Sequence, residues 1–468
     1  MSTDQTARLA ARETHHASRS THHQPLRVGM LSLGCPRTLV DSELVLGRLR
    51  GAGYAMASEL ASADVAIINT CSFVQESIRE SIDAILDVLA LKRQGKLRVV
   101  LVAGCLPQRY PLELYEELAE VDGFLGTDGF TDVDRVLAHV LDGQRPLAVR
   151  KRPQVPHFGL AERVSLTPAH YAYLKISEGC LKGCSFCIIP KLKGPLRSRP
   201  VDDVVQEAQR LIQERGCREL ILVGQDTSDY GVDLAGRPQL VELMDRLSRL
   251  EGVRWLRLLY CHPRGVSDDV IALIAERPTI CKYLDMAIEH ADDAVLQRMN
   301  RGMTRAGLET LIERLRARVP GIALRTSVIV GFPGETEAAF EGLCQFLQWA
   351  RFERLGAFTY SREEGTASYG LADHVPDEVK QGRYQRLMAL QQEIARDVNA
   401  TLLGRELLVH IDELDAHDPQ LALGRSAADC PEVDGLVYVK GASLRPGDFV
   451  SVRITDTYEY DLVGVPVR

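Results

Sequence analysis

Between residues 26 and 150, apolar runs of strand length alternate with amphipathic helical segments. Three of these runs end in a cysteine: RVGMLSLGC (Cys35), DVAIINTC (Cys71) and VVLVAGC (Cys105). Strands that alternate with helices predict βαβ units and a doubly wound parallel sheet. The functional crevice of such a sheet lies beyond the carboxyl ends of its strands. The three cysteines, spaced 36 and 34 residues apart, are therefore expected to converge at one edge.

Two interpretations of these cysteines are open. Free cysteines are often buried singly, so they can be three unrelated thiols. Their repeated position at the end of a strand favours the other interpretation, a site in which three thiolates share one metal cluster.

Residues 171–375 repeat the strand-and-helix pattern six times. The strand candidates are AYLKISEGC, ELILVGQD, WLRLLYCH, YLDMAIEH, IALRTSVIVGFPG and RLGAFTYS. Six β/α units predict an open, partial (β/α)6 barrel whose function lies at the C-terminal ends of its strands. The Pro-, His- and Arg-rich residues 151–170 are predicted to be a linker, and residues 376–400 a connecting helix.

The pattern changes at residues 401–468, where short alternating strands are separated by Gly and Pro turns. This pattern predicts a small antiparallel β-barrel. The segment carries 6 Lys and Arg against 12 Asp and Glu, a net charge of −6 out of −8 for the chain. A module that tracks phosphate backbones should be basic, so this one favours a basic partner. Its densest acidic run, Asp412, Glu413, Asp415 and Asp418, is predicted to be a docking edge or a solvated loop.

The N-terminal residues 1–25 include four histidines and lack the apolar core of a signal peptide. They are predicted to form a disordered tail rather than a metal site. No apolar run reaches the length of a membrane span. Eleven cysteines, an odd number, favour reduced thiols. These features predict a cytoplasmic protein that does not enter a membrane.

A second cysteine group, with the spacing C-x3-C-x2-C, follows the first strand of the predicted barrel. It consists of Cys180, Cys184 and Cys187. Three thiolates can hold three corners of an iron–sulfur cube and leave the fourth iron open to a small chelating molecule. A structural zinc site would close with a fourth ligand nearby, but the next cysteine, Cys217, lies 30 residues further on. A zinc knuckle or three buried thiols without a ligand role are the alternatives.

With Phe186 just before its last cysteine, this motif resembles the signature of radical S-adenosylmethionine (SAM) enzymes. The order of a three-cysteine domain, this core and a C-terminal β-barrel resembles the methylthiotransferases over nearly the whole chain after the tail. In that family the last barrel is a TRAM domain. The motifs LGCPRTLVDSE, INTCSFV, AGCLPQRY and SEGCLKGCSFCIIP are most similar to the RimO-type branch, which modifies a ribosomal protein. Relatives that modify tRNA usually carry GCQMN-like residues at positions 34–37 and beyond.

The resemblance implies two 4Fe-4S clusters and SAM as cofactors. Cys35, Cys71 and Cys105 would ligate an auxiliary cluster that carries the sulfur to be inserted, and Cys180, Cys184 and Cys187 a radical-generating cluster. The residues that it implies for the SAM pocket are Phe186 near the adenine, Gly224 and Gln225 at the methionine end, Val330 within the motif Thr326–Glu335, and Glu289.

The roles of Glu289, Arg197, Arg199 and His290, near the implied pocket, are considered separately. Glu289 stands where the family usually has the amide of a PLQH-like motif, and a carboxylate there can still accept hydrogen bonds from a ribose hydroxyl. Arg197 and Arg199 either face the SAM carboxylate or form a solvated basic loop. His290 is expected to be structural.

The implied reaction adds a methylthio group to the β-carbon of one aspartate in small-subunit ribosomal protein twelve, and it uses two SAM molecules. The implied partners are that basic protein, either free or inside the ribosome, and a reductant such as flavodoxin or ferredoxin. One alternative is the same chemistry on adenosine in tRNA, which the acidic barrel and Cys35-Pro36-Arg37 disfavour. The other is a non-enzymatic, metal-bearing RNA-binding or scaffold protein.

Overall fold

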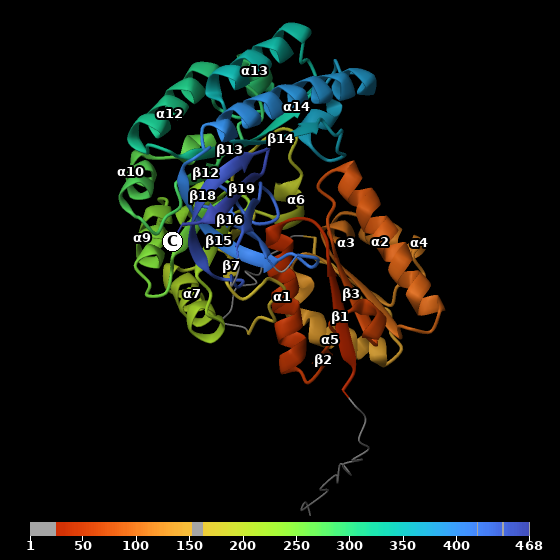
Figure 1. Cartoon of the computed structure of the whole chain (residues 1–468). Coiled ribbons are helices and arrows are strands. Elements are labelled where there is room, and N and C mark those ends of the chain that lie inside the picture. Colours follow the sequence, from red (N-terminus) through yellow and green to blue (C-terminus); the bar gives the residue numbers. More distant parts are fainter. Residues whose placement is uncertain (1–24, 152–161, 419, 442–443, 468) are drawn as a thin grey trace, which may run out of the picture.

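The computed structural model describes residues 25–151, 162–418, 420–441 and 444–467. The predicted N-terminal tail, apart from its last residue, and the middle of the predicted linker lie outside these residues. Three folded regions follow one another along the chain (Figure 1).

The N-terminal region is a six-stranded, wholly parallel sheet with the strand order β2-β1-β3-β4-β5-β6. Its strands are β1 (Arg27–Ser32), β2 (Ala55–Met56), β3 (Val65–Thr70), β4 (Val99–Gly104), β5 (Gly123–Leu125) and β6 (Leu147–Ala148). Its helices are α1 (Pro36–Gly51), α2 (Gln75–Arg93), α3 (Cys105–Arg109), α4 (Pro111–Glu117) and α5 (Val133–Leu141).

Alternate residues of the central strands pack on opposite faces of this sheet. Val65 and Ile67 of β3 contribute to the core under α1 and α5, whereas Ala66 and Ile68 contribute to the core under α2. All six residues of β3 and of β4 are buried, as expected for parallel strands covered on both faces. The predicted doubly wound sheet is confirmed.

The central region is a partial barrel of six parallel strands with helices outside it. The strands are β7 (Tyr171–Lys175), β10 (Glu219–Val223), β11 (Trp255–Leu258), β12 (Tyr283–Asp285), β13 (Ala323–Val330) and β14 (Arg354–Thr359). A short hairpin, β8 (Ser177–Glu178) with β9 (Arg197–Ser198), follows the first strand. The helices are α6 (Ile189–Lys193), α7 (Val201–Arg215), α8 (Val232–Ala235), α9 (Leu240–Ser248), α10 (Asp268–Glu276), α11 (Asp293–Arg298), α12 (Arg305–Arg318) and α13 (Glu337–Ala350).

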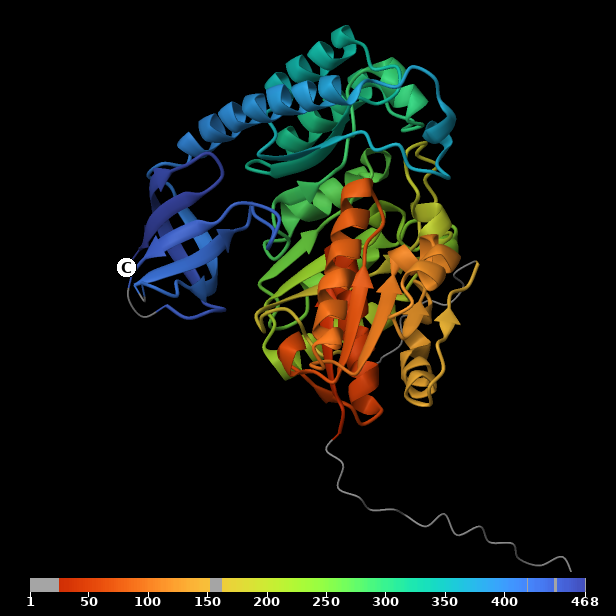
Figure 2. The ribbon, with the colours of Figure 1, turned by 90° about the vertical axis from the view of Figure 1, so that its right-hand side faces the viewer.

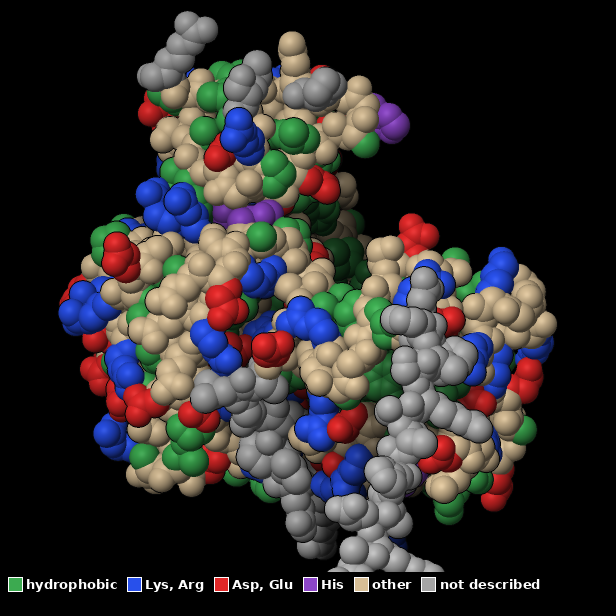
Figure 3. Space-filling view, turned by 90° about the horizontal axis from the view of Figure 1, so that it is seen from below, with side chains coloured by type: hydrophobic (Ala, Val, Ile, Leu, Met, Phe, Trp, Pro, Cys, Tyr) green, Lys and Arg blue, Asp and Glu red, His purple; other side chains and the backbone are tan. Residues whose placement is uncertain are grey.

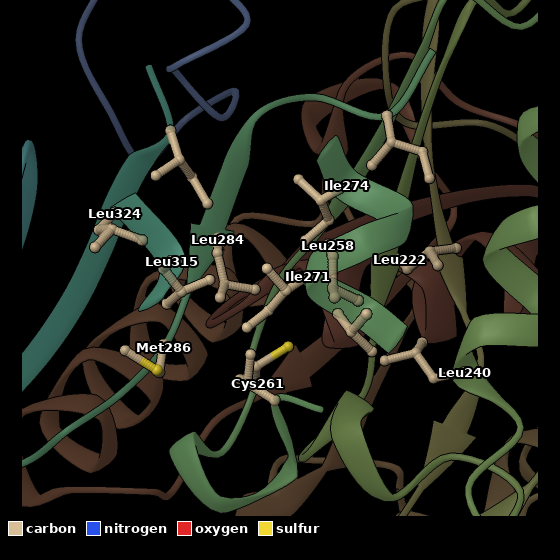
Figure 4. Packing of buried hydrophobic residues seen from close by; sticks show 14 of the residues in the cluster. Leu222, Leu240, Leu258, Cys261, Ile271, Ile274, Leu284, Met286, Leu315 and Leu324 are labelled. Atoms are coloured by element: carbon tan, nitrogen blue, oxygen red, sulfur yellow. The ribbon is translucent and has the colours of Figure 1, made fainter. Parts of the chain in front are cut away.

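The six strands form two three-stranded sheets that are joined through single bridges such as Cys261 with Met286. Between the strands and the outer helices lies the largest apolar core, part of which is shown in Figure 4. There, Leu222, Leu258 and Leu284 point from successive strands toward helix residues such as Ile271 and Leu315. The predicted partial (β/α)6 barrel is confirmed.

The inside of the open barrel is filled by side chains from all three regions. Tyr173 of β7 and Tyr283 of β12 pack there with Val40 of α1 and with Cys430, which lies beyond the barrel in the chain. Both neighbouring regions therefore complete the core of the central one. Sequence periodicity predicts the strands, but it does not predict that Val40 and Cys430 from the neighbouring regions fill the inside of the barrel.

The long helix α14 (Asp377–Ala400) leads to a closed five-stranded barrel, as Figure 2 shows in blue. Its strands are β15 (Glu406–Leu414), β16 (Leu421–Ser426), β17 (Val437–Lys440), β18 (Phe449–Thr457) and β19 (Leu462–Pro466), in the order β15-β16-β17-β19-β18. The small β-barrel is confirmed with one correction. The β17–β19 pair is parallel, because the chain crosses from β17 to β18 before it returns in β19.

Buried charges attach this small barrel to the central barrel, at the amino-terminal ends of the central strands. Glu219, the first residue of β10, accepts hydrogen bonds from Arg257 Nε at 3.0 Å and from Arg425 Nη2 of β16 at 2.8 Å. His410 Nδ1 of β15 lies 3.2 Å from Glu219 Oε2, the oxygen that also accepts from Arg425 Nη2. All four side chains are at most 1% exposed.

Only some of the residues in the predicted acidic edge are exposed. Asp412 pairs with Arg425 (2.7 Å) and with His170 Nε2 (2.9 Å), so its interpretation as a docking or solvated residue was wrong. Long-range partners for its carboxylate cannot be seen in the local sequence. Asp415 accepts backbone N–H groups within its own turn, whereas Glu413 and Asp418 are exposed. Within the described residues, no helix is long and apolar enough to cross a membrane.

Candidate active site between two cysteine triads

The N-terminal triad lies at the carboxyl ends of neighbouring strands. Cys35 precedes α1, Cys71 follows β3 directly, and Cys105 begins α3 directly after β4. The three thiols are close enough for the charge of Cys35 to raise the pKa values of Cys71 and Cys105. The predicted convergence at one sheet edge therefore holds in the structure.

Two glycines permit this close approach. Gly34 has φ +96°, and a Cβ at that position would lie 3.1 Å from Cys71 Cβ. Gly104 has φ +100°, and its Cβ would lie 2.6 Å from the Thr70 carbonyl oxygen. Both φ values are in the region that favours glycine, so side chains here would displace the segments that carry the cysteines.

The thiols of this triad differ in their electrostatic surroundings. Burial raises the pKa of Cys105 to about 12. Burial also opposes ionisation of Cys35, but the charge and the Nε–H of Arg37 hold the pKa of its thiol at about 7. Arg37 therefore favours the thiolate of Cys35, which is the form of cysteine that binds metals.

The second triad lies in the loop that follows β8, at the mouth of the barrel. Gly179 just before it has φ +79°, and a Cβ there would lie 2.1 Å from the Pro195 carbonyl oxygen, so only glycine fits. Burial raises the pKa of Cys180 to about 11 and that of Cys187 to about 12. Cys184 accepts a hydrogen bond from Arg301 Nη1 at 3.1 Å.

A direct contact joins the surroundings of the two triads. Arg37, which donates to Cys35 Sγ at 3.2 Å, also donates through Nη1 to the carbonyl oxygen of Gly224, at the end of β10. Its guanidinium lies 4.7 Å from the ring centroid of Tyr260, which follows β11. Tyr260 and Glu289 both have positive φ values (59° and 69°), and such backbone strain clusters at functional sites.

Four buried charges lie beside this contact. Lys175 of β7 donates to Asp41 of α1 and to Glu178 of β8. Lys193 Nζ lies 3.5 Å from each of the same two carboxylates. Its charge also lowers the pKa of Cys105 against the effect of burial. Two lysines against two carboxylates balance in charge, so the junction of the two regions excludes water at a moderate electrostatic cost.

On the other side of the mouth, the N-terminal region reaches the segment after β14. Arg109 of α3 pairs with Glu363 at 2.8 Å, with side chains 6% and 2% exposed. Gln75 of α2 donates to the same carboxylate at 3.1 Å. The sheet edge with its triad is therefore held against the barrel from the first strand to the last.

Two polar atoms near Gly224 are buried without a hydrogen-bond partner: Ser177 Oγ and Gln225 Oε1. A Cβ at Gly224 would lie 2.7 Å from Ser177 Oγ, so a glycine is needed to leave space beside that hydroxyl. A buried polar atom without a partner calls for an explanation, and a bound ligand or water is one. These atoms fit the polar groups of an amino-acid-like molecule such as SAM.

The other residues predicted for the SAM pocket lie around the second triad. Phe186 packs in a small cluster with Met299, Phe332 and Tyr360. Glu289 is half-buried, and burial raises the pKa of its carboxyl against the effect of Arg301. The Val330 side chain, however, is in the main apolar core, which leaves only its backbone for a ligand.

Arg199 has neither of the roles predicted for it. It is buried, pairs with Glu207 of α7 and donates to the Lys175 carbonyl oxygen. Arg197 is half-buried and donates to the carbonyl oxygens of Pro195 and Lys193, so it supports the loop, and its two predicted roles stay predictions. His290 is fully buried and accepts the Asp292 N–H, which fits its expected structural role.

Sequence reasoning missed several residues of the junction: Arg37, Asp41, Ser177, Lys193 and Arg301. Arg37 could have been found, because it stands two residues from a predicted ligand. The partners of the others come together only in the fold. The described end of the predicted linker is also anchored, since Arg163 pairs with the carboxylates of Glu43 and Glu207.

The donor sets fit iron–sulfur clusters better than single ions. In the described parts of the chain, no three His, Cys, Asp or Glu side chains converge closely enough to hold one metal ion. An iron–sulfur cube instead binds each thiolate to a different iron. Three half-buried thiols in each group offer that arrangement.

Comparisons with known proteins agree with this geometry. Residues 27–126 match the model of "Uncharacterized protein family UPF0004", residues 174–347 that of the "Radical SAM superfamily" and residues 403–467 that of the "TRAM domain". Among solved structures, the radical SAM methyltransferase TsrM from Kitasatospora setae, with cobalamin and a [4Fe-4S] cluster bound, aligns with a TM-score of 0.52. That alignment covers 85% of this chain and 77% of the TsrM chain at 13% identity, a likeness of fold alone. Fold and cysteine motif define a radical SAM protein with a TRAM domain.

Two curated relatives make the class more specific. The ribosomal protein uS12 methylthiotransferase RimO of Anaeromyxobacter sp. (strain Fw109-5) is 49% identical, over 94% of this chain and 92% of its own length. The protein of the same name from Pelotomaculum thermopropionicum is 45% identical, over 94% and 99%. The chain therefore belongs to the RimO family of radical SAM methylthiotransferases. The family implies SAM and 4Fe-4S clusters as its cofactors.

Proposed function

We propose that the protein adds a methylthio group to the β-carbon of an aspartate in the ribosomal protein uS12. The family supports the reaction, and the names of the relatives support the substrate. The observation that carries the proposal is the junction of the two regions that bear the cysteine triads, where Arg37 contacts both Cys35 and the Gly224 carbonyl oxygen at the carboxyl end of a barrel strand. Transfer of a sulfur group to an unactivated carbon needs both centres at one place.

In this proposal the triads have separate roles. Cys35, Cys71 and Cys105 hold the auxiliary cluster, within residues 26–150. Cys180, Cys184 and Cys187 hold the radical-generating cluster, within residues 171–375. When bound, the clusters and SAM supply the electron, the hydrogen-abstracting radical and the methylthio group.

The residues of the chain bind, orient and shield these groups. Ser177 and Gln225 offer their unpaired oxygens to the polar groups of SAM, next to the backbone of Gly224. Phe186, Glu289 and the Val330 backbone line the adenosine side. The buried charges around Asp41 and Lys175 close the junction against water, which protects a radical from side reactions.

The partners follow from the substrate. Ribosomal proteins are basic, and residues 401–468 bring a net charge of −6 to the encounter. The face in Figure 3 intersperses Lys and Arg with Asp and Glu, which favours a protein partner over a phosphate backbone. We place the reaction in the cytoplasm, on free uS12 or within the ribosome, with flavodoxin or ferredoxin as the class of reductant.

The test uses the full chain, reconstituted with iron and sulfide, together with SAM, a reductant and small ribosomal subunits from a strain that lacks the gene. Mass spectrometry should find one methylthio group on uS12 and none on tRNA supplied in parallel. A product on adenosine instead would overturn the substrate assignment.

Cysteine variants test the division of roles in the same assay. Cys184→Ala should lose about half of the iron and all SAM cleavage. Cys71→Ala should keep SAM cleavage but stop transfer. Cys344→Ala, a matched control outside both triads, should keep both iron and transfer. Normal transfer by Cys71→Ala would show that the N-terminal triad does not carry the sulfur.

A further inference from the structure

Each cysteine triad receives a hydrogen bond from one arginine. Arg37 Nε donates to Cys35 Sγ at 3.2 Å, and Arg301 Nη1 donates to Cys184 Sγ at 3.1 Å. The two arginines come from separate regions: Arg37 lies in the first turn of α1, and Arg301 lies shortly after α11. Both triads therefore have the same arrangement, in which one arginine donates a hydrogen bond to one cysteine sulfur.

A second hydrogen bond fixes each guanidinium in place. Arg37 Nη1 donates to the carbonyl oxygen of Gly224, just after β10, and Arg301 Nη2 donates to that of Ala287, just after β12. Arg37 also lies over the ring of Tyr260, and Arg301 is only 6% exposed. The planar fork of arginine makes two such bonds at a set angle, which a lysine cannot do.

Hydrogen bonds and positive charge at a ligand sulfur affect the redox behaviour of an iron–sulfur cluster. They stabilise the reduced state, which is more negative, and thereby raise the reduction potential. The effect is strong where water is excluded, because the local dielectric constant is low.

We propose that Arg37 and Arg301 are positioning residues that set the reduction potentials of the two clusters separately, Arg37 for the auxiliary cluster and Arg301 for the radical-generating one. This inference rests on the proposed function, since it takes both triads as cluster ligands. Separate control matters because one reductant must serve two clusters in a single protein, and only one of them has to pass its electron to SAM.

The test uses two reconstituted full-length backgrounds, each with one intact triad. Cys184→Ala retains the N-terminal triad, and Cys71→Ala retains the barrel triad. Arg37→Gln and Arg301→Gln are placed in each background, and the midpoint potential of the remaining cluster is measured by redox titration with electron paramagnetic resonance. Iron content is measured in all samples.

In the Cys184→Ala background, Arg37→Gln should shift the one-electron equilibrium constant at least tenfold toward the oxidised cluster. This shift corresponds to a midpoint potential that is lower by about 59 mV. Arg301→Gln should leave that potential unchanged. In the Cys71→Ala background the two effects should be exchanged. Arg37→Lys and Arg301→Lys keep the charge but lose the fork, so each should give a smaller fall in its own background.

Two results would overturn the inference while the proposed function stands: both backgrounds hold a cluster but neither potential moves, or both arginines shift both potentials equally. A background that binds no cluster would overturn the assignment of that triad, and this inference with it. These outcomes are distinguishable because iron content and potential are separate measurements.

Discussion

Replacement of Glu219 by glutamine should loosen the TRAM domain from the radical SAM barrel. Glu219 is completely buried and holds Arg257 of the barrel and Arg425 of the TRAM domain on one carboxylate. Both arginines hold the carboxyl pKa of Glu219 well below its usual value despite burial. An amide has the same shape but removes the negative charge that Arg257 pairs with and leaves Arg425 with Asp412 alone.

The expected cost follows from the burial of this group. Removing one partner of a buried ion pair destabilises a protein by about 3–5 kcal/mol. Glu406→Gln in the TRAM domain is the control, because the Glu406–Arg453 pair is 49% and 56% exposed. An exposed pair contributes at most about 1 kcal/mol.

Fluorescence of Trp255 can report on this junction selectively. Trp255 is 4% exposed and packs edge-on against His410 at 5.6 Å and Phe449 at 4.9 Å, both in the TRAM domain. The other tryptophan, Trp349, is exposed and can be removed as Trp349→Phe. In urea, the Trp255 transition of Glu219→Gln should move to clearly lower concentration than that of Glu406→Gln. Equal midpoints for the two variants would refute the importance of this carboxylate.

Two further predictions concern acid stability and the partner. Buried Glu207 has its carboxyl pKa lowered from 4.5 to about 2, because Arg199 and Arg163 outweigh burial. The contribution of the ionised Glu207 carboxylate to stability, about 3 kcal/mol, should be complete above pH 4.5 and lost as the pH falls toward 2. The unfolding free energies of the wild type and of Glu207→Gln should therefore converge near pH 2. A difference that stays constant with pH would contradict this. Replacement of the exposed residues Glu413 and Asp418 by Lys should weaken binding to uS12 at low salt. The control replaces two exposed helical residues, Glu313 and Glu393, by Lys and should weaken binding less. Equal losses would show a general charge effect rather than a docking edge.

Local sequence pattern was sufficient for the elements and for the two triads. A strand followed at once by a cysteine is a local feature, and parallel topology brings such ends together wherever βαβ units repeat. Cys71 and Cys105 could therefore be placed beside each other from their positions alone. The same reasoning put Cys180 at the barrel mouth, since it follows the first barrel strand.

The errors came from residues whose buried partners the local polarity pattern does not reveal. Arg199 and Asp412 looked like surface charges, because the sequence around each is polar. In the structure, Arg199 meets Glu207 on the next helix, and Asp412 meets His170, which is 242 residues away. A pattern of alternating polarity cannot distinguish a charge that faces water from one that faces a buried partner in another domain.

The nature of these buried contacts explains how the fold can hold two reaction centres at a fixed separation. Apolar surfaces pack without strong directionality, and an apolar junction alone could slide or rotate slightly. The junction beside the triads instead contains buried ion pairs among Lys175, Lys193, Asp41 and Glu178. The contact with the TRAM domain, at the amino-terminal ends of the barrel strands, contains Glu219. The contacts of Asp41 with the two lysines, and of Glu219 with Arg425, cross between domains and are lost if a domain shifts, because a displaced buried charge has no water to replace its partner. The charged contacts therefore fix the register of the domains, while Val40 and Cys430 add apolar contacts inside the barrel. Reactions between two clusters depend on that register more than on overall stability.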